Sequence, residues 1–157
     1  MGGSLLRSLC LIIFLLSVAL TLAVAQQPAP AAAAGQGYTL TIIAEGIDEH
    51  DGNIGVLVFN SPKGWAEDRQ SALKDVAVPA HQGTVTVTIP GLPAGEYAVA
   101  LVHDVNKNHK LDKNWAGKPT EQWGLSNNPH AVLKTPSYDS CKFTLKGDLE
   151  LHIKMQM

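Results

Sequence analysis

The residues best suited to hold an ion lie between Asp104 and Asp112, where the sequence reads DVNKNHKLD. Short side chains that carry oxygen occupy positions 1, 3, 5 and 9 of this run. That is the spacing of an EF-hand-type calcium loop, in which alternate residues of a tightly curled segment aim their oxygens at one cation, and position 7 contributes a carbonyl. The pattern therefore predicts calcium ligands at Asp104, Asn106, Asn108, Lys110 and Asp112.

The match to a calcium loop is incomplete at two positions. Position 6, where glycine normally makes a sharp turn, is His109, although His enters the left-handed region more readily than most residues. Position 12, normally a bidentate Glu, is Trp115, so Glu121 or water has to complete the site. Lysines in and after the run also raise the local potential. We therefore expect weak binding, with a dissociation constant on the order of 10⁻⁴ to 10⁻³ M.

Two other interpretations of this loop stay open. In the first, Asp104, Asn106 and Asn108 accept hydrogen bonds from nearby backbone amides and form Asx turns without an ion. In the second, His103, Asp104 and His109 form a transition-metal site or a dispersed catalytic site. The absence of a closely spaced third histidine disfavours the metal version of that site.

Two tryptophans follow the loop, Trp115 and Trp123. Because aromatic side chains present a flat apolar face, this pair is a candidate stacking platform for a sugar or a peptide. The favoured interpretation is that both rings cover the open end of the folded domain.

The elements that must position these residues are short strands. Alternation of apolar and polar residues, with turn residues between the runs, predicts an all-β fold, a seven-stranded antiparallel Greek-key β-sandwich with one short helical insertion at Gly64–Lys74. The predicted strands are Tyr38–Glu45, Ile54–Asn60, Val76–Ala80, Thr84–Pro90, Glu96–His103, Lys142–Lys146 and Leu149–Met155. The Pro-Gly-rich turn after Thr84–Pro90 predicts an antiparallel hairpin with Glu96–His103.

The N-terminal region has the layout of an export signal. Residues 1–25 combine Arg7, an apolar run and a small-residue end at Ala23-Val24-Ala25, which predicts a secretory signal peptide cut before Gln26. Residues 26–37 then read as a flexible linker of Ala, Pro, Gly and Gln, and 38–157 as the globular domain. We expect a periplasmic or secreted protein without a membrane span after cleavage. Its one remaining cysteine, Cys141, is expected to be an inert packing group.

Charge and motifs narrow the function classes. Twelve Lys and Arg against fourteen Asp and Glu leave no excess of positive charge for general nucleic-acid binding. The nucleophile elbow, the zinc-protease helix and the phosphate-binding glycine loop are missing from the sequence, which favours a non-catalytic binding or accessory module. Its expected partner is a protein or glycan of the cell envelope. A carbohydrate- or peptide-binding module, a structural envelope protein and a metal-dependent enzyme are the alternatives.

Several motifs together resemble an uncharacterised bacterial secreted family, domain of unknown function 2141. They are GLPAGEYAV at 91–99, His103-Asp104 with Asn106, Asn108, Leu111 and Asp112, then Gly117, Pro119, Glu121, Trp123, Gly124 and Ser126-Asn127-Asn128. The resemblance covers about Tyr38 to Met155 and implies no established activity. In many members the position that matches His109 looks like Gly. The GLPAGEY turn also resembles prealbumin-like and carboxypeptidase-regulatory-like sandwiches, which are mostly accessory modules.

Overall fold

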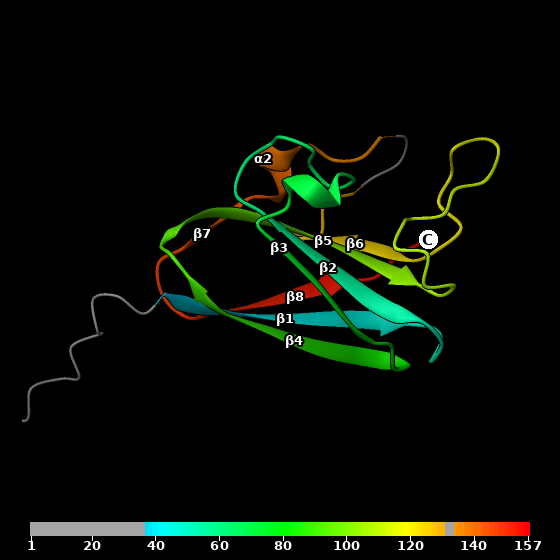
Figure 1. Ribbon diagram of the computed structural model, residues 1–157, viewed down its shortest axis with the longest axis horizontal. Coiled ribbons are helices and arrows are strands. Elements are labelled where there is room, and N and C mark those ends of the chain that lie inside the picture. The colour runs from blue at the N-terminus through cyan, green and yellow to red at the C-terminus, as the bar shows by residue number, and fades with distance from the viewer. Residues whose placement is uncertain (1–36, 131–133) are drawn as a thin grey trace, which may run out of the picture. The chain divides into compact units, whose positions relative to one another are not determined.

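A computed structural model describes residues 37–130 and 134–157. The predicted signal peptide and nearly all of the predicted linker lie outside these residues. The described chain is a β-sandwich with very little helix, which confirms the predicted fold class (Figure 1). Its strands are β1 (Tyr38–Ile47), β2 (Asn53–Phe59), β3 (Lys74–Pro79), β4 (Gly83–Leu92), β5 (Gly95–Asp104), β6 (Trp123–Leu125), β7 (Phe143–Leu145) and β8 (Leu149–Lys154). A 3₁₀ turn, η1 (Arg69–Ser71), and a short helix, α2 (Tyr138–Cys141), complete the fold.

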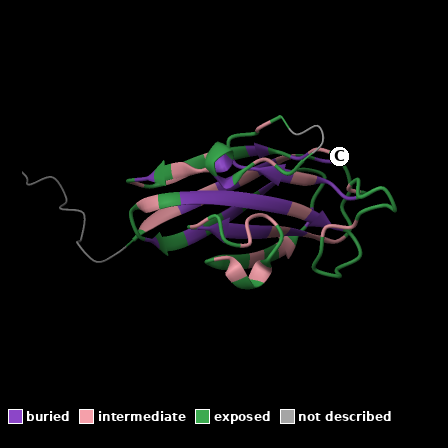
Figure 2. Ribbon diagram, turned by 90° about the horizontal axis from the view of Figure 1, so that it is seen from above, coloured by how far each residue is buried: buried purple, intermediate pink, exposed green. Residues whose placement is uncertain are grey.

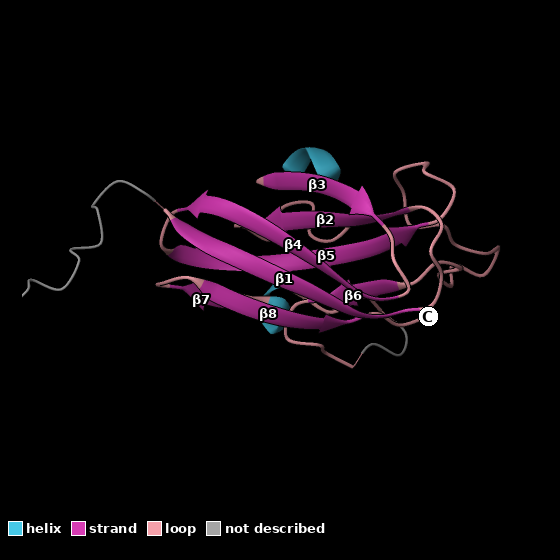
Figure 3. Cartoon of the chain, turned by 90° about the horizontal axis from the view of Figure 1, so that it is seen from below, coloured by secondary structure: helices cyan, strands magenta, loops and turns pink. Residues whose placement is uncertain are grey.

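The strands form two layers (Figure 3). The smaller sheet has the order β4-β1-β8, and the larger has the order β3-β2-β5-β6, with β7 also paired to β5. The core between the layers is built from alternate residues of both sheets, among them Leu40, Ile42, Ile54, Val56, Val58, Val99, Leu101 and Ile153. None of the described helices is long and apolar enough to span a membrane.

The predicted hairpin of the fourth and fifth strands is wrong. β4 pairs with β1 in the smaller sheet, whereas β5 pairs with β2 in the larger one. The reason lies in which faces are apolar: β4 alternates exposed threonines with buried Val85, Val87 and Ile89, whereas β5 is buried on nearly all positions. A strand that is apolar on both faces belongs inside a sheet that is covered on both sides. The turn reverses the chain but carries it to the other sheet.

Two further expectations of the strand pattern need correction. The sandwich is not wholly antiparallel, because β1 and β8 run parallel, with Ile42 opposite Leu151. A strand was also missed: β6 is three residues long and has no periodicity to detect. It forms because Gly124 pairs with Leu101 at the edge of β5.

The predicted helical insertion shortens to a single turn. The expected range Gly64–Lys74 contains only η1, which is capped by Asp68, whose carboxylate accepts from the Gln70 N–H. Gly64 and Ala66 both have positive φ, which interrupts any α-helix before it can extend. α2 was not expected, and it ends at Cys141, directly before the predicted strand Lys142–Lys146.

A second apolar cluster lies on the outer face of the larger sheet (Figure 2). Its buried members are Leu57, Phe59, Ala98, Ala100, Leu125, Tyr138 and Cys141. Trp65 covers part of this face, because its ring meets Phe59 and Tyr138 edge to face and its indole N–H donates to the Pro136 carbonyl at 2.8 Å. The larger sheet is therefore packed on both sides near α2.

Candidate functional site

The rest of that outer face is open and forms a groove. A row of small or flat side chains crosses the sheet, because Gly55 lies opposite Ala77 on β3 and Val102 on β5, and Val102 lies opposite Trp123 on β6. There is free space for a side chain at Gly55. A Cβ built there would lie 3.7 Å, an ordinary van der Waals distance, from its nearest neighbour, the Val102 carbonyl. The floor is thus low because its side chains are small.

Two segments that are far apart in the sequence form the walls. Ala66 and Glu67 stand on one side, and the stretch from Leu111 to Pro119 stands on the other. The larger groove has a volume of about 630 Å³ and extends over Trp123 and Leu125, and a smaller one of about 220 Å³ adjoins it over Gly55 and Ala77. We call these the larger and the smaller groove.

An ion pair joins the two walls where the grooves meet. The ammonium of Lys113 lies 2.9 Å from Glu67 Oε1, and both side chains are exposed. An exposed pair of this kind contributes at most about 1 kcal/mol, so a ligand that engages Lys113 can displace Glu67 readily. Lys118 and Lys134 line the same groove, which gives it a positively charged rim.

Trp123 is the aromatic member of the groove lining. Its indole N–H is buried and has no hydrogen-bond partner among the described residues. Its backbone is held on both sides, by β5 and by a bridge to Gln156. The backbone of Trp123 is thus held in place, while its indole N–H has no hydrogen-bond partner among the described residues.

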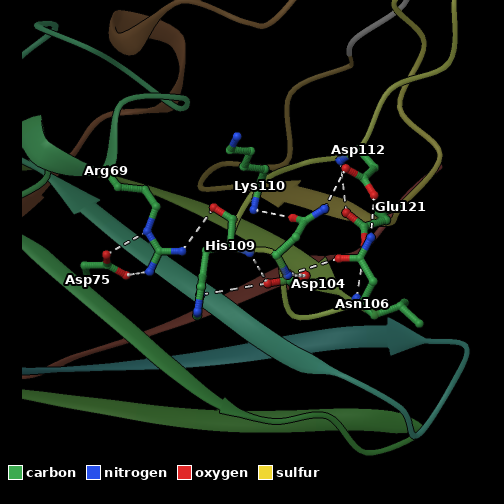
Figure 4. A network of polar contacts seen from close by, with 10 residues as sticks. Arg69, Asp75, Asp104, Asn106, His109, Lys110, Asp112 and Glu121 are labelled. Atoms are coloured by element: carbon green, nitrogen blue, oxygen red, sulfur yellow. Dashed lines mark hydrogen bonds and ion pairs between the residues drawn. The ribbon is translucent and has the colours of Figure 1, made fainter.

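The Asp104 loop closes the end of the smaller groove, and its hydrogen bonds are those of the Asx-turn interpretation (Figure 4). Asp104, 4% exposed, accepts from the backbone N–H of Asn108 at 3.0 Å and of His109 at 2.7 Å. Asn106 Oδ1 accepts from the N–H of Asn108, and Asn108 Oδ1 from that of Lys110. Each of the three predicted turn residues therefore bonds a nearby amide.

The remaining acidic residues of the loop are also engaged. Asp112 accepts from the side-chain amides of Asn106 at 2.7 Å and Asn108 at 2.9 Å. Glu121 is 7% exposed and accepts from the backbone N–H of Val105 and of Asp112, each at 3.0 Å. Glu121 thus ties the beginning of the loop to its end.

Four of the predicted calcium ligands are brought together: Asp104, Asn106, Asn108 and Asp112 meet around the two asparagines. The carboxylates of Asp104 and Asp112, however, accept hydrogen bonds from N–H groups. Within residues 37–130 and 134–157, no three His, Cys, Asp or Glu side chains gather as a metal-binding group. A cation would therefore need the amide groups of Asn106 and Asn108 to turn so that their oxygens replace their nitrogens.

His109 takes the left-handed conformation that the loop requires at its sixth position, with φ 64°. Its carbonyl accepts from Arg69 at 3.2 Å, and Arg69 is itself paired with Asp75 on β3. Arg69 therefore links the loop to β3 through His109. At the start of the loop, Gly52, with φ 83°, lies so close to Asp104 that any Cβ would collide with the Asp104 backbone.

The three residues of the dispersed-site interpretation do not converge. His103 is 2% exposed, and its Nε2 donates to the Asp51 carbonyl at 2.7 Å. Its Nδ1 lies 3.4 Å from Gln122 Oε1. His109 is largely exposed, with Nδ1 4.0 Å from Asp104 Oδ2. His103 therefore holds the β1–β2 turn, while His109 faces solvent.

The two candidate tryptophans occupy different environments. Trp115 is 99% exposed, whereas Trp123 is partly buried on β6. The residues that line the grooves include Trp123, Ala116 and Lys118 but not Trp115. The pair does not form one platform in this structure.

Cys141 is a packing group, as expected. It is fully buried in the outer cluster, and burial raises the pKa of its thiol, so the reactive thiolate is suppressed. Its carbonyl accepts from Ser126 Oγ at 2.6 Å, and the same hydroxyl accepts from the N–H of Val99. Ser126 therefore fastens α2 to β5.

The groove floor was not identified from the sequence. Gly55 interrupts an otherwise apolar strand, and a glycine inside a strand often marks a place where something approaches closely. Alanines at positions 77 and 100 gave no such signal. The walls are formed by loops whose meeting depends on the whole fold.

Comparison with known proteins gives one match. A model of the family described as uncharacterized protein conserved in bacteria (DUF2141) matches residues 42–153, well over half of the chain. No curated protein and no solved structure matches the chain. The prealbumin-like likeness therefore stays a prediction.

Proposed function

The chain belongs to the DUF2141 family of uncharacterised bacterial proteins, and we propose that it is an exported, non-catalytic module that binds an acidic carbohydrate in the larger groove and in the smaller groove that adjoins it. The observation that carries this proposal is the larger groove itself, which has a volume of about 630 Å³, an apolar floor and a rim of lysines. Ligand sites are typically concave and mostly apolar, with a few polar groups that orient the ligand.

The chemistry of the lining supports a carbohydrate with negative charge. Trp123 offers an aromatic surface to the apolar face of a sugar ring, and Lys113, Lys118 and Lys134 offer ammonium groups to carboxylates. A neutral apolar ligand would leave these donors without partners.

The catalytic alternative has less support. The His103 ring is buried against the Asp51 carbonyl, and both oxygens of Asp104 hold backbone amides. Neither group is placed to exchange a proton with a ligand in the groove. The Cys141 thiol is buried, and its pKa is raised, so it is not an activated nucleophile.

The test fills the groove floor without disturbing the backbone. Gly55→Leu adds a side chain to the floor of the smaller groove, where the glycine has no close neighbour, and so blocks a ligand that extends there from the larger groove. Thr86→Leu adds a similar side chain on the exposed face of the smaller sheet as a matched control. Calorimetric titration with an oligosaccharide of uronic acids and with its neutral counterpart measures binding. We expect the wild type and Thr86→Leu to bind the acidic sugar, and Gly55→Leu to lose at least tenfold in affinity.

Three outcomes would contradict this function. Equal binding by Gly55→Leu and the wild type would move the site elsewhere. Preference for an acidic peptide over the acidic sugar would replace the ligand class. Binding of neither probe would favour the structural envelope protein. Unfolding curves for each variant check that the sandwich is intact.

Weak calcium binding at the Asp104 loop is a second proposal. The observation that favours it is that hydrogen bonds within one loop bring Asp104, Asn106, Asn108 and Asp112 together, with the Lys110 carbonyl and Glu121 as further candidate ligands (Figure 4). A cation would compete with the two amide donors that now neutralise Asp112. That competition is consistent with the low affinity that the sequence predicts.

Thermal unfolding after chelator treatment tests this second proposal. Calcium at about ten times its dissociation constant stabilises the folded state by roughly 1.4 kcal/mol, and a domain of this size then melts a few degrees higher. Magnesium is the control, and Asp112→Asn should remove the calcium effect. If 10 mM calcium left the melting temperature of the wild type unchanged, the loop would be an Asx-turn structure only.

A further inference from the structure

The most exposed large apolar side chain of the described protein is Trp115, at 99% exposure. It lies in a turn that is rigidly built. Asn114 Oδ1 accepts from the N–H of Ala116 at 2.9 Å and of Lys118 at 3.0 Å, and the Asn114 N–H donates to the Lys118 carbonyl. Lys113 and Pro119 form a bridge below it. The ring is therefore held out in water by a folded turn.

The turn stands at one end of the sandwich. The segment from 105 to 122, yellow-green in Figure 1, projects beyond the C-terminal end of β5. No described side chain covers the Trp115 ring, and it does not line either groove. A partner for this residue therefore has to receive a protruding ring.

Charge around the turn is separated by depth. The lysines of this segment, at 107, 110, 113 and 118, are all exposed. Its acidic residues face inward, since Asp104 and Glu121 are buried and Asp112 is half-buried. Lys113 is paired with the exposed Glu67, so the net positive charge of this surface comes from the other three lysines.

We propose that the Trp115 turn docks on an anionic lipid bilayer. Tryptophan is enriched at the level of lipid headgroups because its ring is apolar at one side and donates a hydrogen bond at the other. Each lysine near an anionic surface adds attraction that salt screens. A bilayer accepts a single protruding ring without a pocket, whereas a sugar or peptide normally sits in a concave site.

Vesicle binding of the exported form of the protein, collected from the producing cells, tests this proposal. Every variant carries the same N-terminus, so binding through that region would not distinguish them. The probes are vesicles of phosphatidylcholine with and without about one third phosphatidylglycerol. Because Trp65 and Trp123 are partly buried, a blue shift of the emission on adding vesicles reports on Trp115.

We expect binding to the anionic vesicles only, and its loss in 0.5 M salt. Trp115→Ala should weaken partitioning about tenfold, since the ring is the apolar part that enters the interface. Lys118→Glu should weaken it by a similar factor. Lys146→Glu is the matched control, because Lys146 follows β7 at the opposite end of β5 and makes the same charge change.

Two results would overturn the proposal. Unchanged vesicle binding by Trp115→Ala would show that another surface makes the contact. A blue shift with an acidic oligosaccharide but not with vesicles would assign Trp115 to carbohydrate. Gly55→Leu separates this proposal from groove binding, because filling the floor should leave vesicle binding intact.

Discussion

On the smaller sheet, each strand buries one face and leaves the other in water: β4 exposes Thr84, Thr86 and Thr88 and buries the residues between them. On the larger sheet, β2 and β5 are apolar on both faces, and their outer face is partly covered by Trp65 and α2. The outer face of the smaller sheet thus contacts solvent, whereas the outer face of the larger sheet is packed under Trp65 and α2. The part of that face that they leave uncovered is the floor of the grooves.

The comparison shows where to look for function in a sandwich of this kind. When an outer face is apolar but only partly covered, folding alone does not explain why its exposed residues are apolar. The polar outer face of the smaller sheet needs no such explanation. Four predictions test how far the two faces differ, beginning with the largest effect.

Removal of Phe59 should have the largest effect. It is fully buried in the outer cluster and packs on Trp65, so Phe59→Ala should reduce the free energy of unfolding by about 3 to 5 kcal/mol. Thr86→Ala, on the exposed face of the smaller sheet, should change it by less than about 0.5 kcal/mol. Urea unfolding followed by circular dichroism measures both. Similar values for the two variants would refute the difference between the faces.

Asp104→Ala should have the second largest effect on the free energy of unfolding. The N–H groups of Asn108 and His109 lose their hydrogen bonds to a buried carboxylate, which corresponds to a loss of roughly 2 to 4 kcal/mol, and only the Asn108 N–H keeps another acceptor, Asn106 Oδ1. Asp104→Asn keeps one carbonyl oxygen and should lose less. Hydrogen exchange at the two amides localises the effect to the loop. Unchanged exchange in Asp104→Ala would mean that the carboxylate does not hold the turn.

Substitutions of His109 should have a smaller effect on stability, and its direction depends on the new residue. Because its φ is 64°, His109→Val should destabilise the protein by about 1 to 3 kcal/mol, whereas His109→Gly should be neutral or stabilising. Both substitutions retain the backbone groups that bond Asp104 and Arg69. Melting temperatures of the two variants give the comparison, and a harmful glycine would show that the imidazole itself supports the loop.

The smallest effect belongs to the polar face. Hydrogen bonds to Glu45, at 2.6 Å, and to Glu150 raise the pKa of His152 above its ordinary value of about 6.5. Because the folded pKa is the higher one, this stabilisation is present below pH 6.5 and is lost as the pH rises through the folded pKa. Urea midpoints at pH 6 and pH 8.5 should differ more in the wild type than in His152→Gln. Equal differences would remove His152 from the pH dependence.

The sequence predicted the strands better than their partners. Alternation in Thr84–Ile89 identifies a one-sided strand because the period of the side chains is local. Pairing is not local: β1 lies between β4 and β8, which come from later parts of the chain. The turn residues were recognised, but a turn does not specify whether the next strand stays in the same sheet.

The candidate site divides in the same way. The Asx-turn alternative for Asp104, Asn106 and Asn108 could be written from spacing, since its hydrogen bonds join residues two to five apart. Glu121 was expected as a cation ligand, and the structure places it on two backbone amides instead. The groove could not be predicted, because Gly55, Glu67 and Trp123 meet only through tertiary packing.

The parallel pairing of β1 with β8 also determines when the chain can fold. Leu40 lies opposite Leu149, so the central strand of the smaller sheet lacks one of its two neighbours until residues 149–154 have been synthesised. Contacts between such distant residues form slowly, because a long loop must close first. A growing chain therefore cannot complete the smaller sheet before β8 has emerged from the ribosome. For a protein that we propose is exported, late completion of this sheet would favour an unfolded polypeptide at the translocation channel.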